Sequence, residues 1–378
     1  MMGNIIYLFN ATTNNIGGAV QNSVNFILNV VKNNDVDKWY FMLNREVAKQ
    51  VCSHLPEDRY CVFDSPAKSI RSRLKIRKLE KDLKPNVVYT SAGPSYVRFR
   101  AKHVVGCSNP YVLGPSPEAL TLLGGKLSTI KRNLHSLYQK LHFHSADHYI
   151  LQTEPSLEEF VKLGFDKVSC SVVHNAISEQ FLDSNLSHND ELPVKQDLSV
   201  FIPSSYYKHK ALETIPLVAR AIKESSNVKV IFYLTIKEEH FENHILPIIE
   251  DCNVGDSIVN LGPFEHSKAK ELYTKYDIVL QPSVLEVFST SYIEAISMNK
   301  PLIVPKLNFT EGICHTYPIY FKALDVDDCA SKVLNARFFY ESLDGYETSR
   351  DIVQKYGSQE SRYFKIMELL NSIGGGGD

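Results

Sequence analysis

The 378-residue sequence predicts an α/β protein built from two doubly wound parallel sheets, each in a Rossmann-like domain. Short apolar runs alternate with helix-length periodic segments along the chain, which is the pattern of successive βαβ units. The chain is also longer than one domain usually is. A polar stretch, residues 178–197, separates two such series, and we interpret it as an interdomain linker.

The individual elements follow from the apolar pattern. Candidate strands of the first half are residues 5–9, 39–43, 86–90, 103–107 and 148–152. Those of the second half are residues 198–202, 228–234, 257–261, 277–281 and 301–305. Apolar positions within residues 19–31 fit one face of a helix. Further helices are predicted at residues 211–224, 267–275, 290–298, 325–336 and 358–372.

These elements define the predicted domain organisation. We expect an N-terminal domain over residues 1–177, the linker 178–197 and a second domain over 198–357. Residues 358–378 are expected to form a helix that crosses back to the first domain, followed by a tail. Ligands of doubly wound sheets bind at the carboxyl ends of the strands, so we expect the two domains to face a binding cleft.

Composition narrows the class of protein. Seven scattered cysteines without metal-ligand spacing predict a reduced, cytoplasmic protein. No apolar run reaches about 18 residues, so no transmembrane helix is expected. The net charge of −2 conceals an asymmetry: residues 1–176 hold 22 basic and 14 acidic side chains (+8), and residues 177–378 hold 19 and 29 (−10). This predicts two domains with different partners.

Residues 283–301, SVLEVFSTSYIEAISMNKP, contain two glutamates eight positions apart, directly after the strand 277–281. A helix that begins near Ser289 and Thr290 would point its first amides and its positive dipole end at a ligand, which suits a phosphate. Glu294, expected in the first helical turn, could accept two hydrogen bonds from a vicinal diol such as a ribose. Two alternatives remain open: Glu294 could form a capping box with Ser291, and Glu286 could be a solvated loop residue.

This stretch resembles the E-x7-E motif of retaining glycosyltransferases with the GT-B architecture, of the group-1 or family-4 type. The usual form of the motif is P-S-x-x-E-G-F-G-x-x-x-x-E-A-x-x-x-G-x-P. The matching residues are Pro282, Ser283, Glu286, Phe288, Glu294, Ala295 and Pro301. Val287, Ser289 and Asn299 stand where the family prefers glycine. The resemblance implies that Glu294 binds the nucleotide ribose and that Glu286 faces the donor sugar and its developing charge.

A second segment, FIPSSYYKHKALETIP (201–216), resembles the family's G-R-x-x-x-x-K-G segment. Lys210 matches the lysine, which would neutralise the departing diphosphate. Ser205 replaces the expected arginine, so that cation is either absent or supplied by Lys208 or His209. Outside the resemblance, a lone lysine near a helix start can equally be a solvated side chain.

Other segments follow in the family's order. Gly17 and Gly18 come after the first strand, where the family has a glycine loop beside the donor diphosphate, although such a pair also fits an ordinary tight turn. Phe264 lies in the segment that would line the nucleotide base. Asn109 and Tyr111 follow the strand 103–107 and are weaker candidates for acceptor contacts, with packing or surface roles as the alternative.

No metal site or cofactor is predicted. His142, His144 and His148 cluster, but no carboxylates accompany them at metal-ligand spacing. The resemblance implies a metal-independent, front-side reaction in which the leaving phosphate takes the acceptor proton.

Residues 68–84 hold eight cationic and two acidic side chains, and their apolar positions are divided between two sides. Two interpretations fit this segment equally. It is either a solvated helix face or a surface that attracts anionic lipid or a lipid-linked diphosphate. Nucleic acid is not expected, because no aromatic residues are interleaved with the charges.

Together these observations predict a retaining glycosyltransferase of the hexosyltransferase type, with a nucleotide-diphospho-sugar donor bound by the second domain. We expect a glycan acceptor on a lipid carrier, bound by the first domain, as in O-antigen, lipopolysaccharide or capsule assembly. The protein would then lie in the cytoplasm, peripheral to the inner membrane face. The alternative is a non-catalytic GT-B module that binds nucleotide sugar and scaffolds a partner enzyme; a sugar-nucleotide epimerase fits the E-x7-E pattern less well. The nucleobase, the sugar and the linkage stay open.

Overall fold

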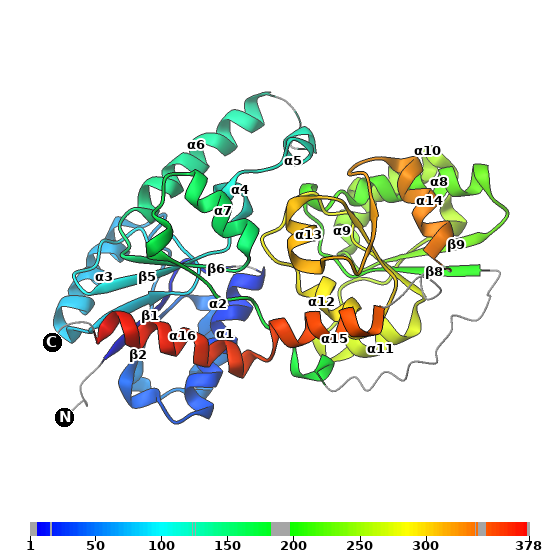
Figure 1. Ribbon diagram of the computed structural model, residues 1–378. Coiled ribbons are helices and arrows are strands. Elements are labelled where there is room, and N and C mark those ends of the chain that lie inside the picture. The colour runs from blue at the N-terminus through cyan, green and yellow to red at the C-terminus, as the bar shows by residue number, and fades with distance from the viewer. Residues whose placement is uncertain are drawn as a thin grey trace. The chain divides into compact units, whose positions relative to one another are not determined.

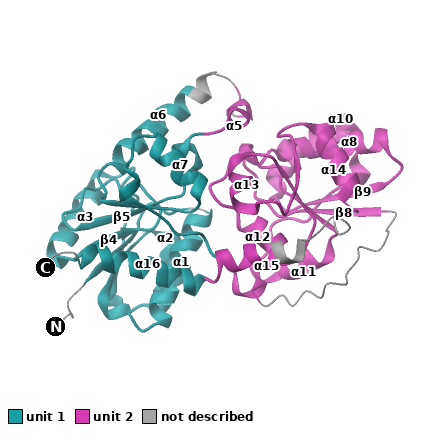
Figure 2. Cartoon of the chain, in the orientation of Figure 1, with its two compact units in different colours: residues 1–114, 130–176, 359–378 teal, residues 115–129, 177–358 magenta. Residues whose placement is uncertain are grey.

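The computed structural model describes residues 6–15, 17–122, 124, 126–182, 197–336, 338 and 345–375 (Figure 1). The chain forms two compact units (Figure 2). Unit 1 comprises Met1–Gly114, Ile130–Ala176 and Gln359–Asp378. Unit 2 comprises Pro115–Thr129 and Ile177–Ser358.

Unit 1 contains a seven-stranded sheet in the order β3-β2-β1-β4-β5-β6-β7, and all neighbouring strands are parallel. Its strands are β1 (Tyr7–Ala11), β2 (Trp39–Leu43), β3 (Tyr60–Val62), β4 (Val87–Thr90), β5 (Lys102–Cys107), β6 (His148–Leu151) and β7 (Cys170–Val172). Its helices are α1 (Gly17–Lys32), α2 (Arg45–Val51), α3 (Ile70–Leu83), α4 (Pro110–Leu113), most of α6 (Lys126–Phe143), α7 (Glu154–Lys162) and α16 (Gln359–Gly374).

Unit 2 contains a six-stranded parallel sheet in the order β10-β9-β8-β11-β12-β13. Its strands are β8 (Asp197–Ile202), β9 (Lys229–Leu234), β10 (Ile258–Asn260), β11 (Ile278–Leu280), β12 (Leu302–Pro305) and β13 (Ile319–Phe321). Its helices are α5 (Pro117–Leu122), α8 (Ile215–Ser225), α9 (Glu238–His240), α10 (Leu246–Cys252), α11 (Ala269–Lys275), α12 (Thr290–Ser297), α13 (Asn308–Cys314), α14 (Val326–Asn335) and α15 (Gly345–Tyr356).

The predicted fold class, two doubly wound parallel sheets, is confirmed. Each predicted strand has a counterpart, and β2 has the predicted bounds. The sequence analysis missed β3, β7 and β13, which have three residues each and are too short to show a periodic pattern. Residues 183–196 of the predicted linker lie outside the described part of the chain.

Burial on both faces of the sheets explains the continuous apolar runs of the central strands. All five residues of β1 and all five of β2 are buried, as expected for parallel strands covered by helices on both sides. In unit 1 the core includes Phe9, Phe41 and Val24 of α1. In unit 2 separate apolar clusters lie on the two faces of the sheet. Rigid sheets of this kind fix the loops at their carboxyl edges.

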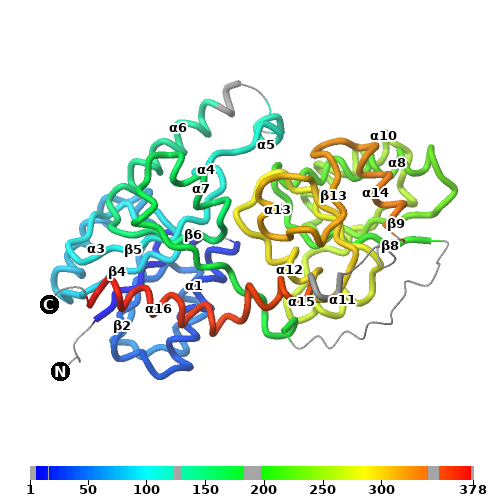
Figure 3. The backbone as a smooth tube through the Cα atoms, viewed as in Figure 1, coloured from blue at the N-terminus to red at the C-terminus, as the bar shows by residue number. Residues whose placement is uncertain are grey.

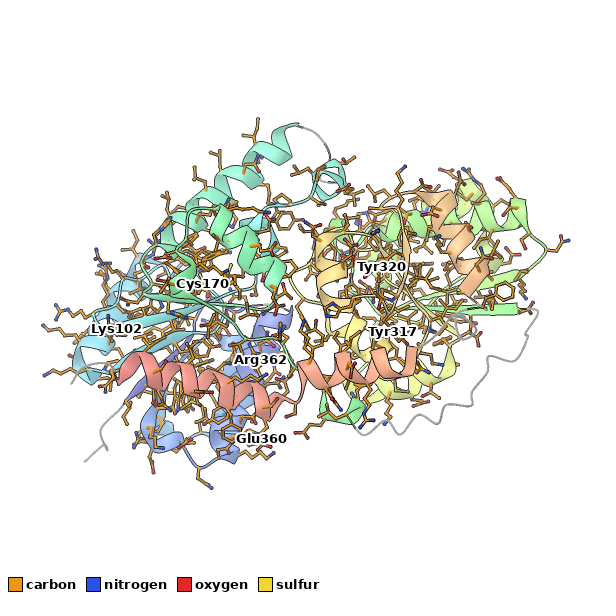
Figure 4. All side chains as sticks on the ribbon, viewed as in Figure 1. Lys102, Cys170, Tyr317, Tyr320, Glu360 and Arg362 are labelled. Atoms are coloured by element: carbon orange, nitrogen blue, oxygen red, sulfur yellow. The ribbon has the colours of Figure 1, made fainter. Side chains whose placement is uncertain are left out.

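Helix α16 completes unit 1. It lies beside α1 and β4 (Figure 3), and Tyr363, Ile366 and Leu370 enter the core there. The Tyr363 hydroxyl donates to Asp35 at 2.9 Å. Figure 4 shows Arg362 and Glu360 on this helix; Arg362 is buried beside Tyr89, and burial lowers the pKa of its guanidinium.

One segment of the predicted N-terminal domain belongs to the other compact unit. Pro115–Thr129 follow β5 of unit 1 in the chain but group with unit 2. The Ser116 hydroxyl donates to the Val284 carbonyl at 3.1 Å, which holds this segment against the loop that follows β11. None of the helices described for the chain combines the length and the apolar composition needed to cross a bilayer.

Candidate functional site

The candidate site of unit 2 lies at the switch point of its sheet. Strands β8 and β11 are neighbours, but β9 lies on the far side of β8 and β12 on the far side of β11. The chain therefore leaves these two strands in opposite directions, which opens a crevice at their carboxyl ends where ligands of doubly wound sheets bind. The loops that follow β8 and β11 contain Lys210 and Glu286.

Lys210 and Glu286 form an ion pair whose two side chains are only 16% and 13% exposed. The Ser283 hydroxyl donates a hydrogen bond of 2.9 Å to the same carboxylate oxygen of Glu286. The backbone joins the loops as well, because the Val284 N–H donates to the His209 carbonyl at 2.8 Å. A cation and a carboxylate are thus held together at the carboxyl edge.

Lys208 points to a different partner. Its ammonium lies 2.6 Å from Glu213, which also accepts a hydrogen bond of 2.6 Å from the Tyr206 hydroxyl. The hydrogen bond to Glu213 raises the pKa of Lys208. Lys208 is about half exposed, and its ion pair neutralises Glu213.

Helix α12 begins at Thr290, as the sequence predicts. Ser289 is the N-cap, yet its side chain makes no capping hydrogen bond and lies 2.8 Å from the Ser291 hydroxyl instead. The side chain of Ser289 thus accepts no hydrogen bond from the first amides of α12. The positive end of the helix dipole lies at the end of the loop that contains Glu286. An anion is the natural ligand for such a helix end.

Glu294 is the fifth residue of α12, so our expectation of a place in the first turn is wrong. The capping-box alternative is wrong too, because the carboxylate contacts side chains. One oxygen accepts a hydrogen bond of 3.0 Å from the Tyr273 hydroxyl, and the other lies 3.1 Å from His266 Nε2. The Glu294 side chain is 7% exposed, and that of His266 is 59% exposed.

Glu294 and burial affect the protonation of its two partners, His266 and Tyr273. The hydrogen bond to Glu294 raises the pKa of His266, against the opposing effect of burial. Burial raises the pKa of Tyr273 well above its usual value, so the phenol stays a neutral donor. The Gln180 side-chain amide contacts the His266 carbonyl at 2.9 Å and fixes this residue from the other side. His266 is therefore the exposed partner of Glu294, and Tyr273 is the buried one.

Sequence reasoning missed His266 and Tyr273, which lie 28 and 21 residues before Glu294. No local spacing connects residues so far apart, although both stand in residues 261–277, the segment that the resemblance implies would line the base. Phe264 of that segment is partly buried against the core, with its ring centroid 6.1 Å from that of Phe201.

The structure explains how the chain accommodates the lost glycines. Asn299 has φ +49° just after α12, a left-handed conformation in which asparagine is the commonest substitute for glycine. Ala211, at the last position of the K-G pattern, is buried and has φ +53°. Val287 does not have a positive φ, and its side chain is buried in the loop, 5% exposed.

Unit 1 has its own switch point, between β1 and β4. The side chains of Asn14, Ser23 and Ser91 form a hydrogen-bonded cluster there, with distances of 2.6–2.8 Å. Gly17 and Gly18 lie at the start of α1, and both are exposed. Only Gly17, with φ +61°, needs the conformational freedom of glycine; a Cβ on either residue would meet no atom within 4 Å.

Asn109 and Tyr111 both contact α6. The Asn109 side-chain amide donates to Gln139 at 2.9 Å, and its oxygen caps α4. The Arg132 guanidinium lies 4.1 Å from the centre of the Tyr111 ring. These contacts are the packing role that the sequence analysis left open for the two residues.

The histidine cluster is held by structural contacts. His142 lies 4.9 Å from the Tyr96 ring, His144 stacks on Phe165 at 4.3 Å, and His148 is 2.8 Å from the Ser171 hydroxyl. Burial lowers the pKa of His142 and of His148. Within the described ranges, no group of three or more His, Cys, Asp or Glu side chains is arranged to hold a metal ion.

Comparison with known proteins finds similarity to glycosyltransferases. Residues 183–329 match the model of the family "Glycosyl transferases group 1". The chain is 24% identical over 221 residues to an uncharacterized glycosyltransferase, MJ1607, from Methanocaldococcus jannaschii. That match covers 55% of this chain and 54% of the relative, so the chain spans about half the length of the curated relative it matches.

Solved structures show the fold. The Anabaena protein HepE, in complex with UDP and glucose, has a TM-score of 0.69 and 14% identity, with 98% of this chain and 100% of HepE covered. The lipopolysaccharide outer core galactosyltransferase WaaB has a TM-score of 0.64 and 12% identity, with 97% and 98% covered. The expected GT-B architecture of two Rossmann-like domains is confirmed.

Proposed function

We propose that this chain is a retaining glycosyltransferase of the hexosyltransferase type that uses a nucleotide-diphospho-sugar donor. The observation that supports it best is the meeting of Lys210, Glu286 and the start of α12 at the switch point of unit 2. The family match spans these residues, and a protein of the same fold binds UDP and glucose.

Each part of the site suits one part of such a donor. The first amides of α12, with Ser289 and Thr290, would bind the diphosphate. Glu294 would accept hydrogen bonds from the ribose diol, displacing the exposed His266 side chain. The backbone near Phe264 would line the base. Glu286 would then face the sugar, whose anomeric carbon gains positive charge as the bond to phosphate breaks.

The ion pair between Lys210 and Glu286 gives each residue a role in the reaction. Lys210 neutralises a carboxylate that would otherwise be poorly solvated. When a donor binds, the same ammonium can turn to the diphosphate and stabilise the charge of the departing group. Lys210 and the dipole of α12 supply positive charge without a metal ion, so we propose metal-independent transfer. The leaving phosphate would accept the proton of the attacking hydroxyl.

Unit 1 is the proposed acceptor side, where Asn109 and Tyr111 are the candidate residues, and Gly17 and Gly18 at the start of α1 are the proposed contribution of unit 1 to the donor diphosphate. We propose a glycan acceptor on a lipid carrier, as in O-antigen, lipopolysaccharide or capsule assembly. WaaB, a lipopolysaccharide galactosyltransferase of the same fold, supports this choice. A lipid carrier would place the protein at the cytoplasmic face of the inner membrane. The cations of residues 68–84 suit that location.

The test is transfer from defined donors. Purified protein is incubated with UDP-, GDP- and dTDP-hexoses and candidate acceptors, and release of the nucleotide and formation of a glycoside are followed by chromatography. NMR of the product shows whether the anomeric configuration is kept. The non-catalytic alternative predicts saturable nucleotide binding in calorimetry with no release from any donor. Inversion of the anomeric centre would disprove the retaining mechanism.

A further inference from the structure

The outward face of α6 is apolar although it is exposed. Ile130, Leu134, Leu137, Tyr138 and Leu141 are 41–65% exposed. Their spacing of 4, 7, 8 and 11 residues from Ile130 places them in one stripe along the helix. The opposite side of the helix, with Ser136 and Phe143, is buried. A surface helix normally has the reverse arrangement, so this stripe is a candidate interaction surface of unit 1.

Helix α3 continues this surface. The Arg73 guanidinium donates to the Tyr138 hydroxyl at 3.0 Å, which joins the two helices. On α3, exposed residues at the same spacing as those of the α6 stripe also share one face. The first two are apolar, Ile70 (74% exposed) and Leu74 (59% exposed), and the remaining three are cations. These cations are Arg77, Lys78 and Lys81. We call the α6 stripe and this face of α3 the docking face.

The cationic end of the docking face borders a depression of about 500 Å³. Arg77, Lys78 and Lys81 line it together with Arg98 and Arg100. Glu80 also lines it, but its buried carboxylate accepts hydrogen bonds from the backbone N–H groups of Arg100 and Ala101. Among the residues that the structure describes, none of the five cations forms an ion pair. The depression therefore suits phosphate groups.

We infer that the docking face binds the surface of an anionic phospholipid bilayer, with the α6 stripe inserted among the acyl chains and the α3 cations on the headgroup phosphates. Residues 126–143 contain no acidic residue, and Lys131 and Lys140 flank the stripe on its two sides. An apolar face bordered by cations is the composition of helices that lie in a membrane interface. A second copy of the chain fits less well, because it would bring two cationic faces together.

This inference deepens the proposed membrane location and rests on it only for the choice of partner. It assigns insertion to α6, a helix outside residues 68–84, and it gives Arg73 a structural role. That side chain is partly buried and donates to the Pro66 carbonyl at 2.6 Å, so it joins α3 to its surroundings. The lipid-facing cations of α3 are the exposed ones.

The experiment is sedimentation of the full chain with vesicles. Wild type should bind vesicles of phosphatidylcholine with about 30% phosphatidylglycerol much better than pure phosphatidylcholine. The variant L134Q/L137Q/L141Q should bind at least about tenfold more weakly, because exposed leucines that become buried in lipid are replaced by polar groups. The control V168Q changes a residue of unit 1 that is 87% exposed and outside the docking face, and it should bind like wild type.

Two further sets of variants test the contribution of the cations and the insertion of α6 separately. R77Q/K78Q/K81Q should lose the preference for anionic vesicles, as wild type should in high salt, whereas R45Q/K49Q should not. L137W provides a probe of depth, because the single native tryptophan, Trp39, is fully buried and gives a constant background. Its emission should shift to shorter wavelength with anionic vesicles.

Equal binding by wild type and the triple leucine variant, or an unshifted emission of L137W, would overturn the inference. So would light scattering that shows a wild-type dimer and a monomeric leucine variant, since the docking face would then hold a second copy. Vesicle binding needs no catalysis. Absence of sugar transfer in every protein would therefore contradict the proposed function and leave the membrane result standing.

Discussion

Lys210 and Glu286 are 76 residues apart in the sequence, yet they form an ion pair whose side chains are both less than one-fifth exposed. Such a pair is rigid in a way that a surface pair is not, because each charge depends on the other for its solvation. It also means that a variant of either residue leaves the other charge unpaired. Tests of the site must therefore measure folding and chemistry separately.

Lys210→Ala should lower turnover about 10²–10³-fold, the usual cost of removing one preorganised group that stabilises developing charge. The assay is release of the nucleotide at saturating donor, with circular dichroism as the check of folding. Lys208→Ala is the matched control, since this lysine is in the same short helix but contacts Glu213. Loss of turnover in Lys208→Ala alone would show that our alignment of this loop is shifted by two residues.

Glu294→Gln should weaken nucleotide binding by about 1.5–3 kcal/mol, because a charge-assisted hydrogen bond to the diol is lost. Calorimetry with the nucleoside diphosphate measures this, and the exposed Glu271→Gln on α11 is the control. With the 2′-deoxy nucleotide, the difference in affinity between wild type and Glu294→Gln should be much smaller than with the ribonucleotide. Equal losses for both nucleotides would show that Glu294 acts on the loop and not on the ribose.

The pKa of His266 should fall when Glu294 is replaced by glutamine, because the hydrogen bond to Glu294 is what raises it. The raised pKa means that the contact stabilises the folded protein below the unfolded pKa of about 6.5, and that this contribution is lost as pH rises through the folded pKa. NMR titration of the imidazole signals measures the pKa directly. His148, whose pKa is lowered by burial, should titrate alike in both proteins. An unchanged His266 titration would contradict the contact.

Ala211→Val should destabilise unit 2 by at least about 2 kcal/mol, because a β-branched residue is a severe misfit at positive φ. Ala211→Gly should remain within about 1 kcal/mol of wild type, since relief of the strained backbone offsets the greater freedom of glycine in the unfolded chain. Thermal unfolding of the two variants tests the pair. Equal stability of the valine variant would mean that this turn does not need a left-handed residue.

The sequence predicted the sheets well because buried parallel strands are written as continuous apolar runs, as in residues 39–43. It also placed Lys210 and Glu286 at the carboxyl ends of their strands, where topology brings them together. The sequence did not predict contacts that depend on long-range packing. His266 reaches Glu294 only because the loop after β10 folds back over α12, and no spacing in the sequence encodes that.

The glycine positions show a second limit. Ala211 and Asn299 look like departures from a family pattern, but both keep the left-handed backbone that glycine would adopt. Residue identity records the side chain and not the dihedral angles. The α6 stripe shows a third limit: the sequence analysis predicts no helix over residues 126–143, and only the structure shows a helix there whose apolar side faces outward.

Helix α16 has a consequence for how the protein is made. The strands of unit 1 are translated before those of unit 2, but the core of unit 1 includes Tyr363, Ile366 and Leu370. The core of unit 2 is complete once Tyr356 has emerged. Unit 1 therefore completes its core only after unit 2 has been translated, and the apolar surface that α16 covers beside α1 stays exposed until then. During that interval the nascent N-terminal half is the natural client of ribosome-associated chaperones.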